Sequence, residues 1–179
     1  MAKNIVVISS TLRNNGNSEL LAKEFLKGAQ EVGNNVEFVT LQDKEIKFCK
    51  GCLACQKIGH CVITDDTIEI TEKMKNADVI AFASPIYYYE MSGQLKTMLD
   101  RANALFASDY KFRDIYFLST AADTDPHSAD IAIQGIKGWI ACFSKAQFKG
   151  AVLGAGAKAP GDVINNPAMQ KAYEMGKGV

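Results

Sequence analysis

The stretch Asn4-Ile-Val-Val-Ile-Ser-Ser-Thr-Leu-Arg-Asn-Asn-Gly-Asn-Ser18 decides the fold, because an apolar strand runs directly into a polar loop and then into a helix. Apolar runs of strand length recur further along the chain, and most are continuous instead of alternating. Continuous apolar strands are typical of a parallel sheet that is buried on both faces. The predicted strands are Asn4–Ser9, Val36–Leu41, Val79–Ala83, Ile115–Ser119 and Ala151–Leu153.

Segments with helical periodicity separate these runs. In the first of them, Leu21, Phe25 and Val32 lie on one stripe. Alternating strands and helices with right-handed crossovers predict a doubly wound α/β fold, with five parallel strands in the order 2-1-3-4-5. We expect residues 1–179 to form one domain, with a single long irregular segment at residues 42–66. Ligands of such sheets bind beyond the carboxyl ends of the strands, so the loops after strands one, three and four are the first candidates for a site.

The loop after the first strand contains the hydroxyl, amide and cationic side chains that suit a phosphate. Free amide groups at a helix N-terminus, together with the helix dipole, attract anions. The loop lacks both the G-x-G-x-x-G and the G-x-x-x-x-G-K-[ST] spacing, which excludes two common nucleotide loops and leaves a monophosphate. A helix cap is the alternative role of Asn17 or Ser18. The candidate phosphate-binding residues are Ser10, Thr11, Arg13, Asn17 and Ser18.

The loop after the third strand contains three consecutive tyrosines, Tyr87 to Tyr89, behind the rigid Pro85. Three neighbouring tyrosines cannot all enter a core, and they suit the edge and face of a flat ring. An exposed aromatic loop or a subunit interface is the alternative.

At this point the sequence resembles a known family. The segment Ser84-Pro-Ile-Tyr-Tyr-Tyr…Ser92-Gly-Gln-Leu-Lys…Asp100-Arg101 resembles the SPIY…S-x-Q-L-K…DR signature of flavodoxin-like NAD(P)H-dependent FMN reductases. The first loop resembles the G-S-x-R-x-N-G-N-[ST] loop of that family, except that Ser10 replaces glycine. Residues 154–176 also resemble its C-terminal helix. The resemblance covers essentially the whole chain.

The resemblance implies a flavodoxin-like fold, bound FMN, and NAD(P)H as the co-substrate. It also implies a homodimer or homotetramer in which a partner subunit closes the flavin site. Thr11, Arg13, Asn17 and Ser18 would then hold the FMN phosphate. Lys96, Asp100 and Arg101 match the signature but are expected to be structural or interfacial. The ring would contact Pro85, Ile86, Tyr87 and Tyr88, and its pyrimidine edge would face Thr120, Ala121, Ala122 and Asp123.

Four cysteines lie within the irregular segment, with the spacing Cys49-x2-Cys52-x2-Cys55-x5-Cys61. Two short spacings allow one loop to wrap a metal cluster, and a similar motif belongs to the iron–sulfur flavoprotein branch of the family, which implies a [4Fe-4S] cluster. Free thiols, a disulfide or another metal are the alternatives. In each case we expect the four cysteines to meet at one site beside the flavin. Cys142 is expected in the core.

Composition narrows the function further. The 179 residues include 20 basic and 20 acidic ones, so the net charge is zero, with no basic stripe for nucleic acid and no cationic cluster for a membrane surface. The chain begins with a strand-like run instead of a signal peptide, so we expect it in the cytoplasm. No hydrolytic constellation is visible. We therefore expect an FMN-dependent oxidoreductase that passes electrons from NAD(P)H to a flavin, a quinone or another small acceptor. The alternative is an electron carrier, of flavodoxin or iron–sulfur flavoprotein type, that serves redox proteins.

Overall fold

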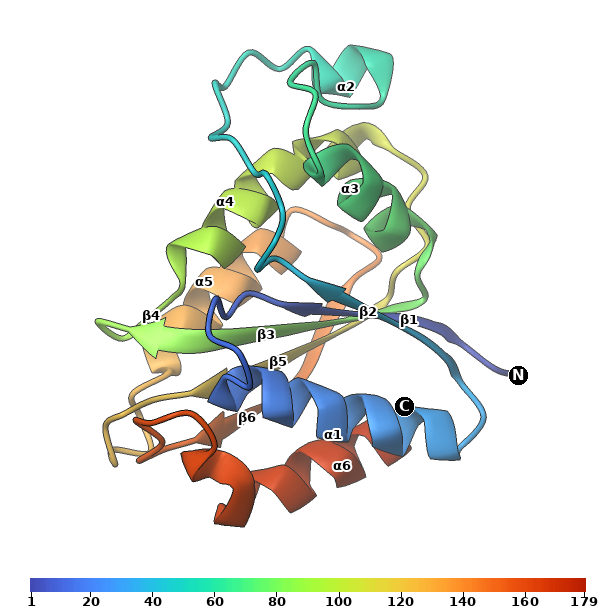
Figure 1. Cartoon of the computed structure of the whole chain (residues 1–179). Helices are drawn as coiled ribbons and strands as arrows, with labels where there is room; N and C mark the ends of the chain where they lie inside the picture. The colour runs from blue at the N-terminus through green and yellow to red at the C-terminus, as the bar shows by residue number, and fades with distance from the viewer.

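A computed structural model describes residues 1–179, and its centre is a twisted sheet with the strand order β2-β1-β3-β5-β6 (Figure 1). These strands pair in parallel throughout, which confirms the expected doubly wound sheet and its order. The short strand β4 was not expected, and it pairs antiparallel with the end of β3. The strands are β1 (Asn4–Ser9), β2 (Asn35–Thr40), β3 (Val79–Tyr87), β4 (Glu90–Met91), β5 (Asp114–Thr120) and β6 (Gln147–Gly154).

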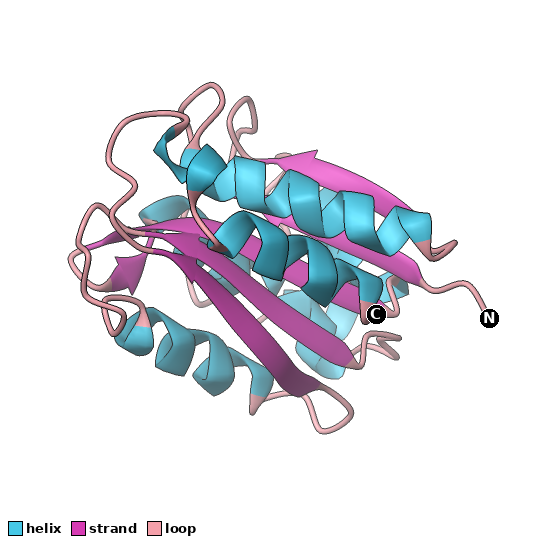
Figure 2. Cartoon of the chain, turned by 90° about the horizontal axis from the view of Figure 1, so that it is seen from below, coloured by secondary structure: helices cyan, strands magenta, loops and turns pink.

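Helices cover both faces of the sheet, and Figure 2 shows two of them, α1 and α6, side by side on one face. The opposite face is covered by α3, α4 and α5 (Figure 1). A single turn, α2, lies within the cysteine-rich segment. The helices are α1 (Asn17–Glu31), α2 (Cys55–Ile58), α3 (Thr67–Asn76), α4 (Gly93–Arg101), α5 (Asp130–Ile140) and α6 (Ala168–Lys177), with 3-10 turns η1 (Ala102–Ala107) and η2 (Asp162–Asn165).

Two hydrophobic cores lie on the two faces of the sheet, and successive residues of each central strand enter different cores. In β1, Val6 and Ile8 pack under α3 and α4, whereas Ile5 and Val7 pack under α1 and α6. Side chains of a strand point alternately to the two faces, so a strand that is buried on both must be apolar throughout. This is why the continuous apolar runs predict the sheet correctly.

Two glycines bring α1 and α6 unusually close together. A Cβ at Gly28 would overlap the carbonyl oxygen of Tyr173, and a Cβ at Gly176 would overlap that of Phe25. The backbones of the two helices are therefore in direct contact, without side chains between them. No helix of this structure has the length and apolar character needed to cross a membrane.

Candidate functional site

A pocket of about 260 Å³ opens where β1, β3 and β5 end and α1 begins. It brings together most of the residues that the sequence assigned to a flavin site, although they come from three separate loops. Ala157, Lys158 and Pro160 complete the wall. The expected residues that line it are Thr11, Arg13, Asn17, Ser18, Pro85, Ile86, Tyr87, Thr120 and Ala122.

The N-terminus of α1 forms one end of this pocket. Gly16 precedes the helix in an extended conformation, and no side chain caps the first turn, so its amide groups are free to bind an anion. The hydroxyl of Ser18 is buried and has no hydrogen-bond partner. A Cβ at Gly16 would overlap Oγ1 of Thr11, so the loop is tightly folded here. An uncapped helix with an unpartnered buried hydroxyl fits a phosphate.

Asn17 is placed differently from the expected phosphate ligand. Its Nδ2 donates hydrogen bonds to the carbonyl oxygens of Ala157 (3.3 Å) and Ala159 (2.8 Å). Its Oδ1 accepts one from the amide of Val163 at 3.3 Å. The side chain of Asn17 therefore spends its amide donors on the segment after β6, and it ties that segment to the loop after β1.

The segment after β6 is the part of the pocket wall that sequence reasoning missed. Nη1 of Arg13 donates to the carbonyl oxygen of Lys158 at 3.1 Å, so a second residue of the first loop holds it. Asp162 accepts hydrogen bonds from the amides of Lys158 and Ala159 and fixes the turn. From the sequence, residues 154–176 resemble the C-terminal helix of the family, and none of them is assigned to the site.

Ser10 lies under the pocket and not on its wall. Its hydroxyl donates to the carbonyl oxygen of Ala83 at 3.1 Å and accepts from the hydroxyl of Ser92 at 2.8 Å. The amide of Ser92 in turn donates to the hydroxyl of Ser84 at 2.9 Å, and the Ser92 hydroxyl caps α4. Ser10 thus ties the end of β1 to the end of β3 and to the start of α4.

The tyrosine loop forms a tight hairpin between β3 and β4. Tyr88 and Tyr89 have φ angles of 50° and 68°, a left-handed conformation that bulky residues rarely adopt. Two consecutive residues of this kind are typical of a type I′ turn, which normally contains Asn and Gly. Tyr88 is 99% exposed and does not line the pocket, whereas Tyr87 does. The amide of Ala132 donates to the carbonyl oxygen of Tyr89 at 3.2 Å and anchors the turn to α5.

The loop after β5 supplies two of its four expected residues to the wall, Thr120 and Ala122. Ala121 is buried, and its backbone donates to Gly154 at the end of β6 and accepts from Ala157 just after it. The Asp123 carboxylate accepts the amide of Asp125 at 3.0 Å, which shapes the turn.

The four motif cysteines line a second cavity of about 440 Å³, which shares no residue with the first pocket. The rest of its wall comes largely from the C-terminal ends of α4 and α5, including Arg101 and Trp139. No group of three or more Cys, His, Asp or Glu side chains lies close enough together to hold a single metal ion. All five cysteines are free thiols.

The fifth of them, Cys142, was expected in the core, and this expectation is wrong. Cys142 follows the end of α5 at the surface, where it is exposed and lines the cavity of the motif cysteines. Its neighbours Ile140 and Phe143 fill the core positions of this stretch. Apolar neighbours in the sequence therefore do not indicate that Cys142 itself is buried.

Arg101 is the largest side chain that is fully buried, and its guanidinium forms a two-point ion pair with Asp65. Its Nη1 lies 2.6 Å from Oδ2 and its Nη2 lies 3.0 Å from Oδ1. Burial alone would raise the pKa of Asp65, but hydrogen bonds from Arg101, from Thr67 and from two backbone amides outweigh it and lower the pKa to about 2. The expectation of a structural Arg101 agrees with this position.

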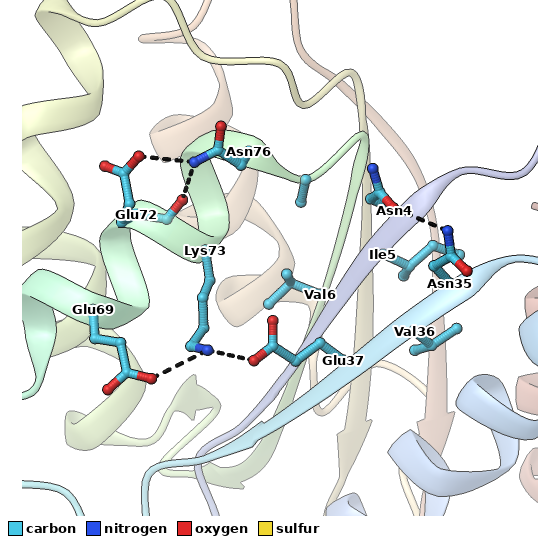
Figure 3. Close-up of a pocket in the computed structure, with 11 residues that line it drawn as sticks. Asn4, Ile5, Val6, Asn35, Val36, Glu37, Glu69, Glu72, Lys73 and Asn76 are labelled. Carbon is cyan, nitrogen blue, oxygen red and sulfur yellow. Dashed lines mark hydrogen bonds and ion pairs between the residues drawn. The ribbon is translucent and has the colours of Figure 1, made fainter.

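A third hollow, drawn in Figure 3, lies between α3 and the edge strand β2. Lys73 points into it and pairs with both Glu37 and Glu69. Hydrogen bonds to these two carboxylates raise the pKa of Lys73. None of the expected site residues lines this hollow, and its central charges are already paired, so it is not the candidate site.

Comparisons with known proteins agree with this geometry. A family model described as NADPH-dependent FMN reductase matches residues 3–153. An iron–sulfur flavoprotein of Methanocaldococcus jannaschii is 34% identical over 98% of this chain and 94% of its own length. Another iron–sulfur flavoprotein, from Archaeoglobus fulgidus, is 28% identical over 91% of this chain and 75% of its own length.

A solved NAD(P)H:quinone oxidoreductase from Methanothermobacter marburgensis superposes with a TM-score of 0.74 over 99% of this chain and 96% of that chain. Its identity is 17%, so this likeness concerns the fold alone. Because the family model spans most of the chain, and the M. jannaschii relative aligns nearly end to end, the chain belongs to the NADPH-dependent FMN reductase family and is an oxidoreductase that uses FMN and NAD(P)H.

Proposed function

We propose that the pocket at the N-terminus of α1 holds the FMN phosphate. The observation that carries this proposal is the buried, unpartnered hydroxyl of Ser18 beside an uncapped helix N-terminus. Ser18 and Thr11 supply hydroxyl donors, and Arg13 supplies positive charge at the rim. Asn17 and Ser10 act indirectly, since their side chains hold the neighbouring segments in place.

The same proposal places the flavin ring against the ends of β3 and β5. Pro85, Ile86 and Tyr87 line the pocket there, and Tyr88 extends from the hairpin beyond it. Thr120 and Ala122, which line the same pocket, would face the polar edge of the ring. Bound FMN supplies hydride and electron chemistry, so the protein needs to supply only position, electrostatics and exclusion of water. A small-molecule acceptor such as a quinone or a flavin would approach the same face.

The experiment that tests the phosphate assignment compares Ser18→Ala with Ser128→Ala. Both hydroxyls are buried and without a partner, but only Ser18 lines the pocket. A hydrogen bond to a charged group is worth about 1.5–3 kcal/mol, so Ser18→Ala should weaken FMN binding by roughly 10- to 150-fold. Riboflavin, which lacks the phosphate, should bind both variants as it binds the unchanged protein. Equal losses for FMN and riboflavin in Ser18→Ala would refute the assignment.

We propose further that Cys49, Cys52, Cys55 and Cys61 hold a [4Fe-4S] cluster, a group that exchanges single electrons. The donor set supports this choice, because four cysteine thiols, the usual ligands of such a cluster, belong to the lining of one cavity. A zinc ion would need its ligand sulfurs gathered at about 2.3 Å from one centre, and no such group is present. The iron–sulfur flavoprotein relatives support the same choice.

Iron and sulfide assays on anaerobically purified protein test the cluster. Cys55→Ser should lose iron, because Cys55 is the buried cysteine of the four and stands at the start of α2. Cys142→Ser is the matched control, since Cys142 lines the same cavity but lies outside the motif. Iron contents below one atom per chain in the unchanged protein after reconstitution would refute the cluster.

With a cluster, a redox protein becomes a second candidate acceptor, as in the electron-carrier alternative. Cys49 and Cys52 are exposed, so a docking protein would reach this cavity without entering the flavin pocket. Reduction of the bound flavin by NAD(P)H in anaerobic stopped flow separates the two roles, because a pure carrier would need a separate reductase.

We also propose one domain for residues 1–179, a homodimer or homotetramer that covers Tyr88, and a cytoplasmic location suited to free thiols.

A further inference from the structure

The cysteine-rich loop leaves the body of the protein and returns to it at one narrow place, its neck. The guanidinium of Arg101, which is 2% exposed, lies in this neck. Its Nη1 donates to the carbonyl oxygen of Lys47 at 2.6 Å, just before the first cysteine. Its Nη2 donates to the carbonyl oxygen of Ile63 at 3.1 Å, just after the last. One side chain therefore joins both ends of the loop.

Asp65 completes the neck from the other side of the ion pair. Its Oδ2 accepts the amide of Lys47 at 3.0 Å, and its Oδ1 accepts the amide of Thr67 at 3.1 Å. Asp66 adds a similar bond from the amide of Glu45 at 2.7 Å. Backbone groups on both sides of the loop are thus fixed to one buried charge pair.

Between the two sides of the neck, the loop has little support of its own. Phe48, Leu53, Ile58 and Val62 all expose more than half of their surface. In Figure 1 the segment that contains α2 projects beyond α3 and α4. A segment with few buried apolar contacts depends on its attachment points for its position. Here the main attachment point is Arg101, supported by a hydrogen bond from Asn103 to the sulfur of Cys55 at 3.2 Å.

One donor of Arg101 remains free. Its Nε is buried and has no hydrogen-bond partner, although both terminal nitrogens are fully engaged. Arg101 lines the cysteine cavity together with Cys55 and Cys61. An unsatisfied buried donor costs free energy and therefore needs an explanation, which a group bound in the adjoining cavity would supply.

We propose that Arg101 is the positioning residue of the cysteine-rich loop: it closes the neck, and it presents its Nε–H to a sulfur of the group that the four cysteines bind. The second part rests on the proposed cluster, whereas the first part does not. A hydrogen bond to a cluster sulfur makes the reduction potential less negative. Lysine cannot replace this arginine, because an ammonium group lacks the planar set of five donors.

Two variants separate positioning from mere stability. Arg101→Lys keeps the charge, and the double variant Arg101→Met with Asp65→Leu removes both charges without leaving one unpaired in the interior. Both preserve the net charge of the site, so a change of potential in them does not come from a change in net charge. The matched control is Lys145→Met with Asp109→Leu, which removes an ion pair that is exposed and outside the cavity. Retained FMN in every variant shows that the fold is intact.

The first readout uses metal-free, reduced protein and needs no cluster. Limited trypsin digestion at Lys50 and Lys57, and alkylation of the buried Cys55, should become at least about tenfold faster in both Arg101 variants, because such reactions follow the local opening of the loop. The control variant should react at the rate of the unchanged protein. Unchanged cleavage and alkylation in both Arg101 variants would overturn the positioning role.

The second readout is the reduction potential of the reconstituted protein, followed by spectroelectrochemistry. We expect a more negative potential in both Arg101 variants and no shift in the control. An unshifted potential would overturn the Nε–H contact. If the unchanged protein binds no iron, the cluster proposal and this contact fail together, while the digestion result still decides the role of Arg101 in the neck.

Discussion

The flavin pocket and the cysteine cavity are built in opposite ways. The pocket lies where three paired strands end, so the register of the sheet places its residues, and Ser10 reinforces the strand ends from below. The cavity lies at the other ends of α4 and α5, under a projecting loop that one buried ion pair attaches. The position of the first site follows from the fold itself, whereas the position of the second depends mainly on the pair of Arg101 and Asp65. The two sites should therefore respond very differently to substitution.

The largest effect should come from Arg101→Ala. This change leaves Asp65 charged and unpaired in the interior, which typically costs about 3–5 kcal/mol of unfolding free energy. Asp109→Ala, which removes one partner of an exposed pair with Lys145, should cost less than about 1 kcal/mol. Urea denaturation of both variants measures the contrast. Equal costs would show that the loop neck is no more important than a surface ion pair.

Asn17→Ala tests whether the flavin pocket also depends on a distant attachment. The change removes three hydrogen bonds to the segment after β6, worth about 1 kcal/mol each. Stability should fall by about 3 kcal/mol, and riboflavin should lose affinity along with FMN because the pocket wall shifts. Isothermal titration with both ligands measures this, with Ser18→Ala as the reference. A loss confined to FMN would return Asn17 to the role of a direct phosphate ligand.

Acid should affect the cysteine loop before the flavin pocket. The folded pKa of Asp65, about 2, lies below its ordinary value of 3.8, so its stabilising contribution is complete above about pH 5 and is lost as the pH falls toward 2. The shift corresponds to about 2 kcal/mol. Trypsin is inactive in acid, so pepsin cleavage of residues 48–62 between pH 5 and 2 is the measurement. Asp65→Asn should show the fast cleavage already at pH 5, and a variant with the pH profile of the unchanged protein would exclude Asp65 as its source.

The smallest effect concerns the hairpin at the rim of the flavin pocket. Tyr89 has a positive φ, so Tyr89→Gly should relieve strain and stabilise the protein by about 1 kcal/mol. Tyr87→Gly, in the regular part of β3, should instead destabilise it by a similar amount. Thermal unfolding distinguishes the two signs. A destabilising Tyr89→Gly would mean that contacts of the tyrosine ring outweigh the strain of its backbone.

Sequence patterns predicted the sheet well because the three central strands β1, β3 and β5 are buried on both faces, which leaves a continuous apolar run in each. The contribution of the first loop to the pocket was also predictable, since Thr11, Arg13, Asn17 and Ser18 lie within one short segment. The wall formed by Ala157, Lys158 and Pro160 was not, because Ala157 and Pro160 have no polar side-chain group and Lys158 is held there through its backbone carbonyl oxygen. Cys142 was expected in the core and is exposed. The helical pattern of its neighbours does not show that α5 ends at Ile140, so the pattern no longer applies at Cys142.

The cysteine spacing predicted a shared cavity, but not what holds it. The contact between Arg101 and Asp65 joins positions that are 36 residues apart, and each residue has an ordinary surface-type side chain. Nothing in a single sequence pairs them. The cysteines are also expected beside the flavin, and this stays a prediction. The two cavities share no residue, and the cysteine cavity lies toward the opposite ends of the helices, which gives the expectation no support.

The close backbone contact between α1 and α6 means that a movement of one helix is passed to the other. On α1 the contact point is Gly28, which lies against the backbone of α6. Ser18 lies ten residues away, about 15 Å along the axis at 1.5 Å per residue. A tilt of α1 by a few degrees about this contact would move its first turn, the proposed phosphate site, by about 1 Å, which is enough to lengthen a hydrogen bond beyond its useful range. A label or truncation at the C-terminus that shifts α6 would therefore also shift the first turn of α1, although the two lie far apart in the sequence.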